Sequence, residues 1–331
     1  MSAIMVKKTQ SGRARVQTEC RNDFNDGTVA RPVDVFFRKT MKMKKHSWAA
    51  LALCVFLSDC IQARLVEQQQ DVAVQVSDMF NKRIEQTIRV TTFFDDATPL
   101  PRPVLVLNHG RAVDAASRAS LGRARYSDAS AWFARNGFLV AVPTRVGYGV
   151  SGGDDVEDSG QCRNKVYPPA YTAAAEQTQA VLQSVWQRPD VDPQRSVVMG
   201  QSFGGTTAVA MAARNPAGVV AAINFAGGGG GNPQTMPQRP CRPDLLERMF
   251  GNYGKTARVP VLWVYTENDQ YFGPTYPREW FEAYQKAGGQ GEFKQFPPHG
   301  EDGHSLFTRF PAVWRPVVSD FLRRQGFEIK E

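Results

Sequence analysis

The sequence of 331 residues is poor in metal-binding side chains and in long apolar runs. It contains four histidines and five cysteines. Its apolar segment Trp48–Leu57 is too short to span a membrane comfortably. It has no internal repeat, and its one strongly biased stretch is a glycine run at residues 227–231. These absences argue against a repeat protein or a membrane-spanning protein. They favour one globular domain of about 250 residues with an additional segment.

Excess positive charge is also absent from most of the chain. Residues 1–63 hold 11 Lys and Arg against 5 Asp and Glu. From the totals of 40 and 32, this leaves 29 basic and 27 acidic residues in the remainder. A remainder so close to balance lacks the positive surface that attracts nucleic acid. We therefore expect no nucleic-acid partner.

The first 63 residues have the layout of a targeting segment. A basic start at Met41–Lys45 precedes the apolar segment Trp48–Leu57, and Ala63 is a small residue at the expected cleavage site. We predict a signal peptide over residues 41–63. The mature protein is then periplasmic or secreted and has no stable membrane span.

Residues 1–40 are polar and show neither a helical nor a strand period. We interpret them as a misassigned gene start or a disordered extension, so that the folded domain covers residues 64–331. One alternative is a genuine tail followed by a membrane-associated segment. Another is a lipoprotein anchored at Cys60, although Asp59 directly before this cysteine makes a poor lipobox.

The cysteines agree with export. Cys20, Cys54 and Cys60 fall in the part expected to be removed, and Cys162 and Cys241 remain, both in loop-like sequence. An even pair in an oxidising compartment predicts a disulfide, with two buried free thiols as the alternative. Two cysteines without paired histidines do not complete a tetrahedral metal site, so we expect no metal.

The strongest local motif is the stretch Ser-Val-Val-Met-Gly-Gln-Ser-Phe-Gly-Gly at residues 196–205. A strand-like run precedes G-x-S-x-G and an Ala-rich, helix-like run follows it, which is the pattern of a nucleophile elbow. Such a turn holds Ser202 in a strained backbone conformation and leaves no room for side chains at Gly200 and Gly204. A chance match is the alternative, because G-x-S-x-G alone is a loose pattern.

Apolar runs alternate with helix-like segments over the rest of the chain. This alternation predicts an α/β fold with a mostly parallel sheet and helices on both faces. The side chains at residues 83–94 alternate in polarity as in exposed antiparallel strands, so we expect a mixed sheet. Residues 64–82 suit a short helix or an extended arm. We expect further strands at residues 104–107, 138–142, 196–199, 219–225, 259–266 and 292–296, and helices at 127–136, 167–187, 206–214, 276–287 and 307–324.

A serine hydroxyl needs a base to become nucleophilic, and the base needs an orienting acid. In an open parallel sheet such groups lie in loops at the carboxyl ends of strands. Asp269 follows the predicted strand at residues 259–266 and lies after the serine in the chain. We predict Asp269 as the acid, with Glu267 as the alternative.

The base has to come from four histidines. His46 lies in the signal region and His109 precedes the serine. His299 and His304 share a loop between the last predicted strand and the last predicted helix. We predict His304, which lies next to the start of the helix, with His299 as the alternative.

The negative charge that develops on the substrate oxygen needs two rigid N–H donors. The backbone N–H of Phe203, directly after the nucleophile, is one candidate. The loop after the predicted strand at residues 104–107 supplies the other. We assign it to the N–H of Arg111, and Gly110 and Ala112 remain alternatives.

The sequence resembles the α/β-hydrolase superfamily over residues 83–325, and within it the dienelactone-hydrolase-like serine hydrolases. The resemblance is carried by Asn108-His109-Gly110, residues 145–149, residues 200–205, residues 267–269 and Gly303-His304. It implies that Ser202 attacks an acyl carbonyl, that His304 takes the proton and that Asp269 holds the imidazole, without a metal or organic cofactor. Dienelactone hydrolase itself uses a cysteine nucleophile, so a serine here favours hydrolysis of small-molecule esters.

The substrate is less defined by the sequence. The loops at residues 151–167 and 227–241 should lie near the site, and a Cys162–Cys241 disulfide would staple them together. Tyr271, Phe272 and Tyr276 either line an apolar pocket or pack in the core, and Arg145 either braces a loop or meets an acidic substrate. Alternatives to an esterase are a peptidase of the prolyl oligopeptidase type, an acyltransferase and a catalytically inactive binding protein.

Overall fold

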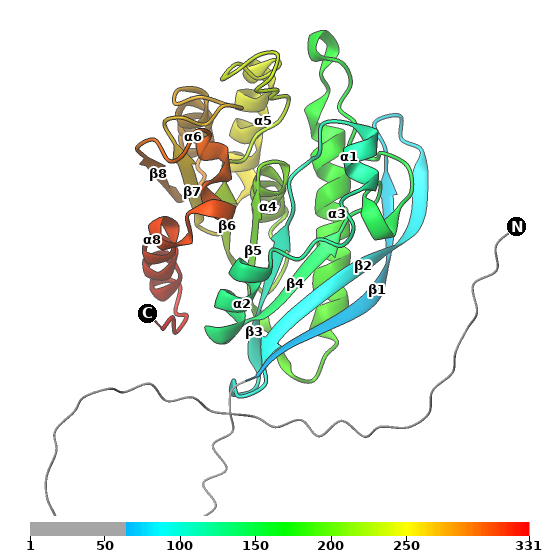
Figure 1. Ribbon diagram of the computed structural model, residues 1–331, viewed down its shortest axis with the longest axis vertical. Coiled ribbons are helices and arrows are strands. Elements are labelled where there is room, and N and C mark those ends of the chain that lie inside the picture. The colour runs from blue at the N-terminus through cyan, green and yellow to red at the C-terminus, as the bar shows by residue number, and fades with distance from the viewer. Residues whose placement is uncertain (1–63, 331) are drawn as a thin grey trace, which may run out of the picture. The chain divides into compact units, whose positions relative to one another are not determined.

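A computed structural model describes residues 64–330 of the chain (Figure 1). The predicted signal peptide at residues 41–63 and the extension at residues 1–40 lie outside the described residues. In the described part, eight strands form one sheet in the order β1-β2-β4-β3-β5-β6-β7-β8. The strands are β1 (Leu65–Ser77), β2 (Arg83–Asp95), β3 (Arg102–Asn108), β4 (Leu139–Thr144), β5 (Val191–Gln201), β6 (Val219–Phe225), β7 (Val261–Thr266) and β8 (Gly291–Phe296).

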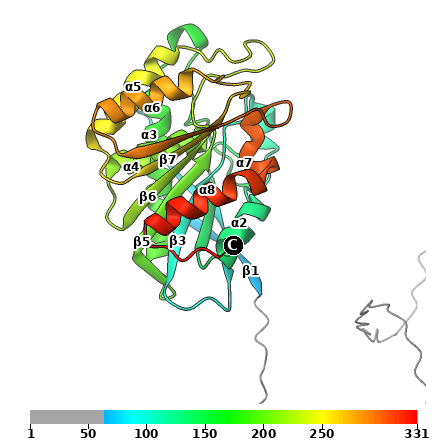
Figure 2. The same cartoon turned by 90° about the vertical axis from the view of Figure 1, so that its left-hand side faces the viewer.

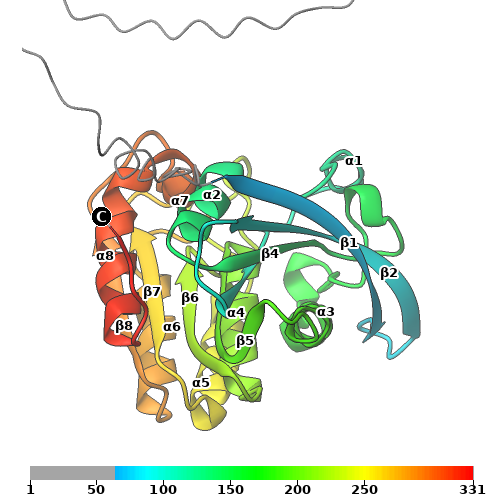
Figure 3. The same cartoon turned by 90° about the horizontal axis from the view of Figure 1, so that it is seen from below.

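The sheet is mixed but mostly parallel. Strand β2 pairs antiparallel with β1 and with β4, and the remaining neighbours pair parallel. The helices are α1 (Ala115–Ala119), α2 (Ser127–Arg135), α3 (Tyr167–Trp186), α4 (Phe203–Arg214), α5 (Pro243–Thr256), α6 (Tyr276–Lys286), α7 (Leu306–Arg309) and α8 (Pro311–Arg324). Helices α2 and α8 cover one face of the sheet, and α3, α4, α5 and α6 cover the other (Figure 2 and Figure 3). The predicted fold class is confirmed.

Strand β3 shows why its apolar run folds this way. Side chains of a strand point alternately to the two faces of a sheet. Val104 and Val106 pack on the face covered by α3 and α4, whereas Leu105 and Leu107 pack on the face covered by α2 and α8. All four side chains are fully buried. A continuous apolar run is therefore what a strand covered on both faces requires.

Two segments differ from the simplest sequence interpretation. The segment left open as a short helix or an extended arm is the edge strand β1, and its buried residues Val72, Val74 and Val76 alternate along the strand. The predicted closing helix is interrupted at Phe310, where α7 ends and α8 begins with Pro311. Proline suits the first position of a helix because its missing N–H would have no partner there.

The carboxyl ends of the parallel strands bring distant parts of the sequence together. Strand β3 leads into residues 109–111, and β5 leads directly into Ser202. Strand β7 leads into Asp269, and β8 leads into the loop that carries His304. Parallel strands end at one edge of the sheet, so these loops share that edge.

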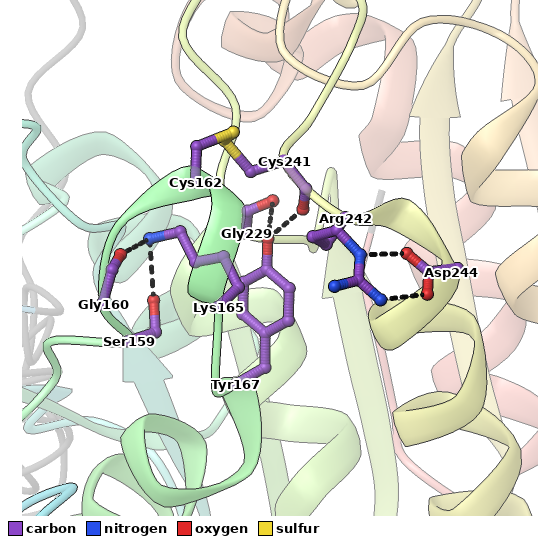
Figure 4. Close-up of a disulfide and its surroundings, with 9 residues drawn as sticks. All are labelled: Ser159, Gly160, Cys162, Lys165, Tyr167, Gly229, Cys241, Arg242 and Asp244. Atoms are coloured by element: carbon purple, nitrogen blue, oxygen red, sulfur yellow. Dashed lines mark hydrogen bonds and ion pairs between the residues drawn. A yellow bond between two sulfur atoms is a disulfide. The ribbon is translucent and has the colours of Figure 1, made fainter.

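Above this edge, the segments at residues 151–167 and 227–241 are joined by a disulfide, and we call them the cover. Figure 4 shows the Cys162–Cys241 disulfide, and the Cα atoms of the two cysteines lie 5.0 Å apart. Next to it, the Tyr167 hydroxyl donates to the backbone carbonyl of Cys241 and lies 3.3 Å from that of Gly229. The predicted disulfide is confirmed, and the tyrosine adds a second link between the two segments.

Replacement of both disulfide cysteines by alanine should lower the free energy of unfolding by about 2–4 kcal/mol, because the bond closes a long loop in the unfolded chain. The two residues are separated by 79 positions in the sequence. Urea unfolding of the Cys162→Ala/Cys241→Ala variant checks this expectation. Reductant should lower the stability of the wild type to that of the variant and leave the variant unchanged. A variant as stable as the oxidised wild type would contradict the prediction.

Candidate active site

Ser202 sits at the turn between β5 and α4 with φ 57° and ψ −123°. A positive φ is uncommon for a residue other than glycine and stores strain. A Cβ atom on Gly200 would lie 2.4 Å from the carbonyl carbon of Gly204, and one on Gly204 would lie 2.2 Å from the carbonyl oxygen of Asn108. The predicted need for glycine at both positions is confirmed.

Asp269 and His304 form a hydrogen-bonded pair. His304 Nδ1 lies 2.9 Å from Asp269 Oδ2, and Asp269 is fully buried. The other carboxylate oxygen accepts the backbone N–H groups of Tyr271 at 2.8 Å and Phe272 at 3.0 Å. A carboxylate accepts, so this arrangement assigns the ring proton to Nδ1 and leaves His304 Nε2 as an acceptor.

The aromatic side chains after Asp269 hold the imidazole ring from two sides. The Tyr271 ring stacks on His304 with 4.1 Å between the centroids. The Phe272 ring meets it edge-on, with 5.3 Å between the centroids. The ring is thus fixed by packing as well as by the carboxylate.

The two alternative residues lie elsewhere. The Glu267 side chain is exposed at the end of β7. His299 is half-buried, and its Nδ1 lies 2.7 Å from the backbone carbonyl of Pro297. The structure therefore pairs His304 with Asp269 and leaves both alternatives outside this pair.

The loop after β3 packs closely against the serine. A Cβ atom on Gly110 would lie 3.2 Å from the Cβ atom of Ser202. The Gly110 N–H donates to the Tyr126 hydroxyl at 3.3 Å, so it is already occupied. Phe203 is the first residue of α4, where a backbone N–H has no partner within the helix. In the described part of the chain, the Ser202 hydroxyl makes no hydrogen bond.

A buried charge network, which the sequence did not reveal, supports this loop. Arg145 and Glu157 are both 0% exposed and form an ion pair. Arg145 Nη1 also donates to the carbonyl of His109 at 2.8 Å, and the Tyr148 hydroxyl donates to Glu157 at 2.8 Å. Buried charges need such pairing. Arg145 therefore braces the loop, which is one of its two predicted roles.

The side chain of Arg111 joins the same region to the cover. It binds Asp155 through two hydrogen bonds of 2.7 and 2.6 Å. Arg118 reaches the same carboxylate at 3.0 Å. Because this carboxylate belongs to the cover, the ion pairs fix the loop after β3 relative to the cover.

A cavity of about 200 Å³ opens above Ser202. Of the three aromatic residues left open between a pocket and the core, Tyr271 and Phe272 line the cavity, whereas Tyr276 stacks on Trp280 away from it. Its walls also include the predicted disulfide and three side chains that the sequence did not single out, namely Tyr167, Tyr171 and Lys165. Together with the backbone of residues 228–231, the aromatic rings give the cavity largely apolar walls, and two cationic residues also line it, Lys165 and the Asp155-paired Arg111.

Of these two residues, Lys165 belongs to the cover and, among the described residues, makes no ion pair with a carboxylate (Figure 4). Its ammonium group donates to the Ser159 hydroxyl at 3.1 Å and to the carbonyl of Gly160. Burial lowers the pKa of Lys165, and the Asp158 carboxylate opposes this shift. Two donated bonds leave a third N–H on the ammonium group for a further acceptor.

The described residues 64–330 contain neither a cluster of metal-binding side chains nor a helix that could span a membrane. Within this range, no group of three or more His, Cys, Asp or Glu side chains is placed to hold a metal ion. None of the helices described there is long and apolar enough to cross a membrane.

Comparison with known proteins adds to this geometry. The model of the Dienelactone hydrolase family matches residues 120–312. No curated protein sequence matches the chain.

Solved structures share the fold. An acetyl xylan esterase from Paenibacillus sp. R4 is 17% identical, with a TM-score of 0.54 over 80% of this chain and 88% of its own. A structure named as a dienelactone hydrolase from Klebsiella pneumoniae is 14% identical, with a TM-score of 0.52 over 81% of this chain and 100% of its own. An acylaminoacyl peptidase from Pyrococcus horikoshii is 14% identical, with a TM-score of 0.56 over 80% of this chain and 43% of its own. Such identities establish the α/β-hydrolase fold and leave the substrate open.

His109, below the site, should make stability depend on pH. Its Nε2 accepts the Arg145 N–H at 3.2 Å, and burial together with the Arg145 charge lowers its pKa well below 6.5. The unfolded state then takes up a proton below pH ~6.5 that the folded state does not. Stability should fall with decreasing pH, by at most about 1.4 kcal/mol per pH unit for this group.

Urea unfolding between pH 8 and pH 5 measures this dependence. The His109→Gln variant keeps a side-chain acceptor but does not titrate, so its stability should fall less steeply below pH ~6.5. Identical slopes for the variant and the wild type would refute the assignment.

Proposed function

The chain belongs to the dienelactone hydrolase family, and from this premise we propose that it is an exported serine hydrolase that cleaves carboxylic esters. The observation that carries the proposal is that a strained Ser202 and a hydrogen-bonded Asp269–His304 pair both follow strand ends at the same edge of the sheet. The order serine, acid, histidine along the chain is that of α/β-hydrolases.

In this proposal, Ser202 Oγ attacks the carbonyl carbon of the ester while His304 Nε2 takes the hydroxyl proton. Asp269 keeps the Nδ1 proton in place and stabilises the imidazolium. The oxyanion accepts hydrogen bonds from the N–H groups of Phe203 and Arg111. His304 then returns the proton to the departing alcohol. A water molecule attacks the acyl-enzyme with His304 as base, which releases the acid and restores Ser202.

One structural detail supports these roles. The N–H of Gly110 is bound to the Tyr126 hydroxyl, which favours Arg111 over Gly110 as the second donor. The proposal also requires the Ser202 hydroxyl, which makes no hydrogen bond in the described residues, to bind His304 Nε2 when substrate is present, because catalytic hydrogen bonds often tighten only in the complex.

Export remains part of the proposal. A disulfide persists in an oxidising compartment and is rare in the cytosol. The Cys162–Cys241 bond is therefore consistent with a periplasmic or secreted protein. The predicted signal peptide at residues 41–63 supports the same location.

The Ser202→Ala variant should show no detectable ester hydrolysis. The test uses residues 64–331, purified under oxidising conditions, with 4-nitrophenyl acetate, butyrate and octanoate and with a fluorophosphonate probe. Removal of a serine nucleophile typically costs about 10⁶-fold in kcat. Labelling that depends on Ser202 without turnover would point to an acyltransferase or a peptidase. Absence of both in folded wild-type protein would favour a binding protein.

We further propose that the preferred ester carries a negative charge near Lys165. A carboxylate in the cavity would accept the remaining N–H of the ammonium group and would offset the cost of burying it. A hydrogen bond between charged groups contributes about 1.5–3 kcal/mol, which corresponds to roughly 10–100-fold in binding.

Two esters of similar length test this charge preference, namely mono-4-nitrophenyl succinate and 4-nitrophenyl butyrate. The Lys165→Met variant should lower kcat/KM for the succinate roughly 10-fold or more and change that for the butyrate less than about twofold. Lys294→Met, on the exposed side of β8, serves as the control. An equal loss for both esters would rule out an anion site.

A further inference from the structure

Two loops of the candidate site and the end of β5 are joined by a chain of hydrogen bonds. The Gly110 N–H donates to the Tyr126 hydroxyl at 3.3 Å, and this hydroxyl donates to Gln201 Oε1 at 3.2 Å. Gln201 Nε2 in turn donates to the backbone carbonyl of His304 at 3.0 Å. The chain thus links the loop after β3, the residue before Ser202 and the loop that carries His304.

The distance between strands explains why such a link matters. Strands β6 and β7 lie between β5 and β8 in the sheet. Neighbouring strands lie about 4.8 Å apart, so β8, which precedes the His304 loop, lies roughly 14 Å from β5, which precedes Ser202. The His304 loop has to reach back across this width to bring the imidazole near Ser202.

Other contacts of this loop hold it to a different strand. Asp269 binds the His304 ring, and Asp302 Oδ1 accepts the N–H groups of both Gln270 and His304 at 3.0 and 2.9 Å. These bonds connect the loop to the segment after β7. The Gln201 amide connects it to β5, the strand that ends at Ser202.

Tyr126 is held in a conformation that its residue type rarely adopts. Its backbone has φ 44° and ψ 50°, directly before helix α2. A left-handed conformation is a genuine outlier for a bulky residue. The ring packs on Phe307, with 5.4 Å between the centroids. This placement puts the hydroxyl between Gly110 and Gln201, and burial raises the pKa of the hydroxyl, which keeps its proton available.

We propose that Gln201 and Tyr126 are positioning residues, which act as one unit to set the Arg111 loop and the His304 loop relative to Ser202. The inference rests on the proposed serine hydrolase function. An amide is well suited to this place because it accepts and donates at the same time. Its loss should slow the chemical step and leave substrate binding largely unchanged, because neither side chain lines the cavity.

The test compares Gln201→Met, Tyr126→Phe and the double variant with 4-nitrophenyl butyrate. Turnover is expressed per site titrated with a fluorophosphonate probe, so that unfolded protein does not count. Gln201→Met should lower kcat per titrated site roughly 10–100-fold with KM changed less than about twofold, since small misplacements of reacting groups have effects of this size. The kcat of the double variant should lie within about twofold of that of Gln201→Met, because the effects of residues that act as a unit are not additive.

Gln295→Met is the matched control. This glutamine on β8 also bridges two groups, since it accepts from Arg278 at 2.8 Å and donates to the carbonyl of Pro274 at 2.8 Å. Its replacement makes the same chemical change away from the site, so kcat should stay at the wild-type value. If Gln201→Met does not fold, Tyr126→Phe carries the test, because it removes one oxygen and keeps the ring.

Two outcomes would overturn the inference. One is a kcat per titrated site that equals the wild-type value in both single variants. The other is a double variant whose fold-loss of kcat is the product of the two single fold-losses. Failure of the proposed function is distinct, because the wild type itself would then neither turn over nor take the probe.

Discussion

The backbone of Ser202 is held in a conformation that its residue type disfavours, and the geometry of the whole site depends on it. Such strain persists only where the surrounding structure determines it. The Ser202 N–H donates to the carbonyl of Phe225 at 2.8 Å, which ties the turn to β6. Gly204 packs against the carbonyl of Asn108, which ties it to β3. The turn is therefore clamped between two neighbouring strands, which hold the Ser202 backbone in its strained conformation.

The same constraint explains why the loop after β3 needs so much buried polar support. Gly110 lies against the serine, so a small shift of this loop would either collide with Ser202 or open a gap beside it. The loop has few apolar side chains with which to anchor itself. Its position is instead fixed by two charged side chains. Arg145 donates a hydrogen bond to the carbonyl of His109, and Arg111 donates to the Asp155 carboxylate. The Arg145–Glu157 pair is fully buried, so a loop position that separated its partners would leave a buried charge without a counter-ion, which is strongly destabilising.

The sequence predicts features that follow from local rules. The elbow is read from two glycines around Ser202, and Asp269 and His304 follow from their positions after predicted strands. Glu157 could not be chosen in the same way, because it stands in an acidic loop where neighbouring carboxylates look equivalent. Its role depends on which of them the tertiary fold buries beside Arg145. Gln201 likewise resembles any variable position of G-x-S-x-G until the fold places the His304 carbonyl beside it.

The cover is organised as a preformed wall, and this affects what can determine specificity. Two contacts join the segments of the cover to each other, namely the disulfide and the hydrogen bond from the Tyr167 hydroxyl to the Cys241 carbonyl. The Arg111–Asp155 ion pair joins the cover to the loop after β3. A surface fixed in this way loses little conformational entropy when a ligand binds, so selectivity comes from shape and charge already present. The shared fold covers enzymes named for different substrates, namely an acetyl xylan esterase and an acylaminoacyl peptidase. The fold alone therefore does not determine the substrate, and in our proposal the cover and its Lys165 supply the selectivity.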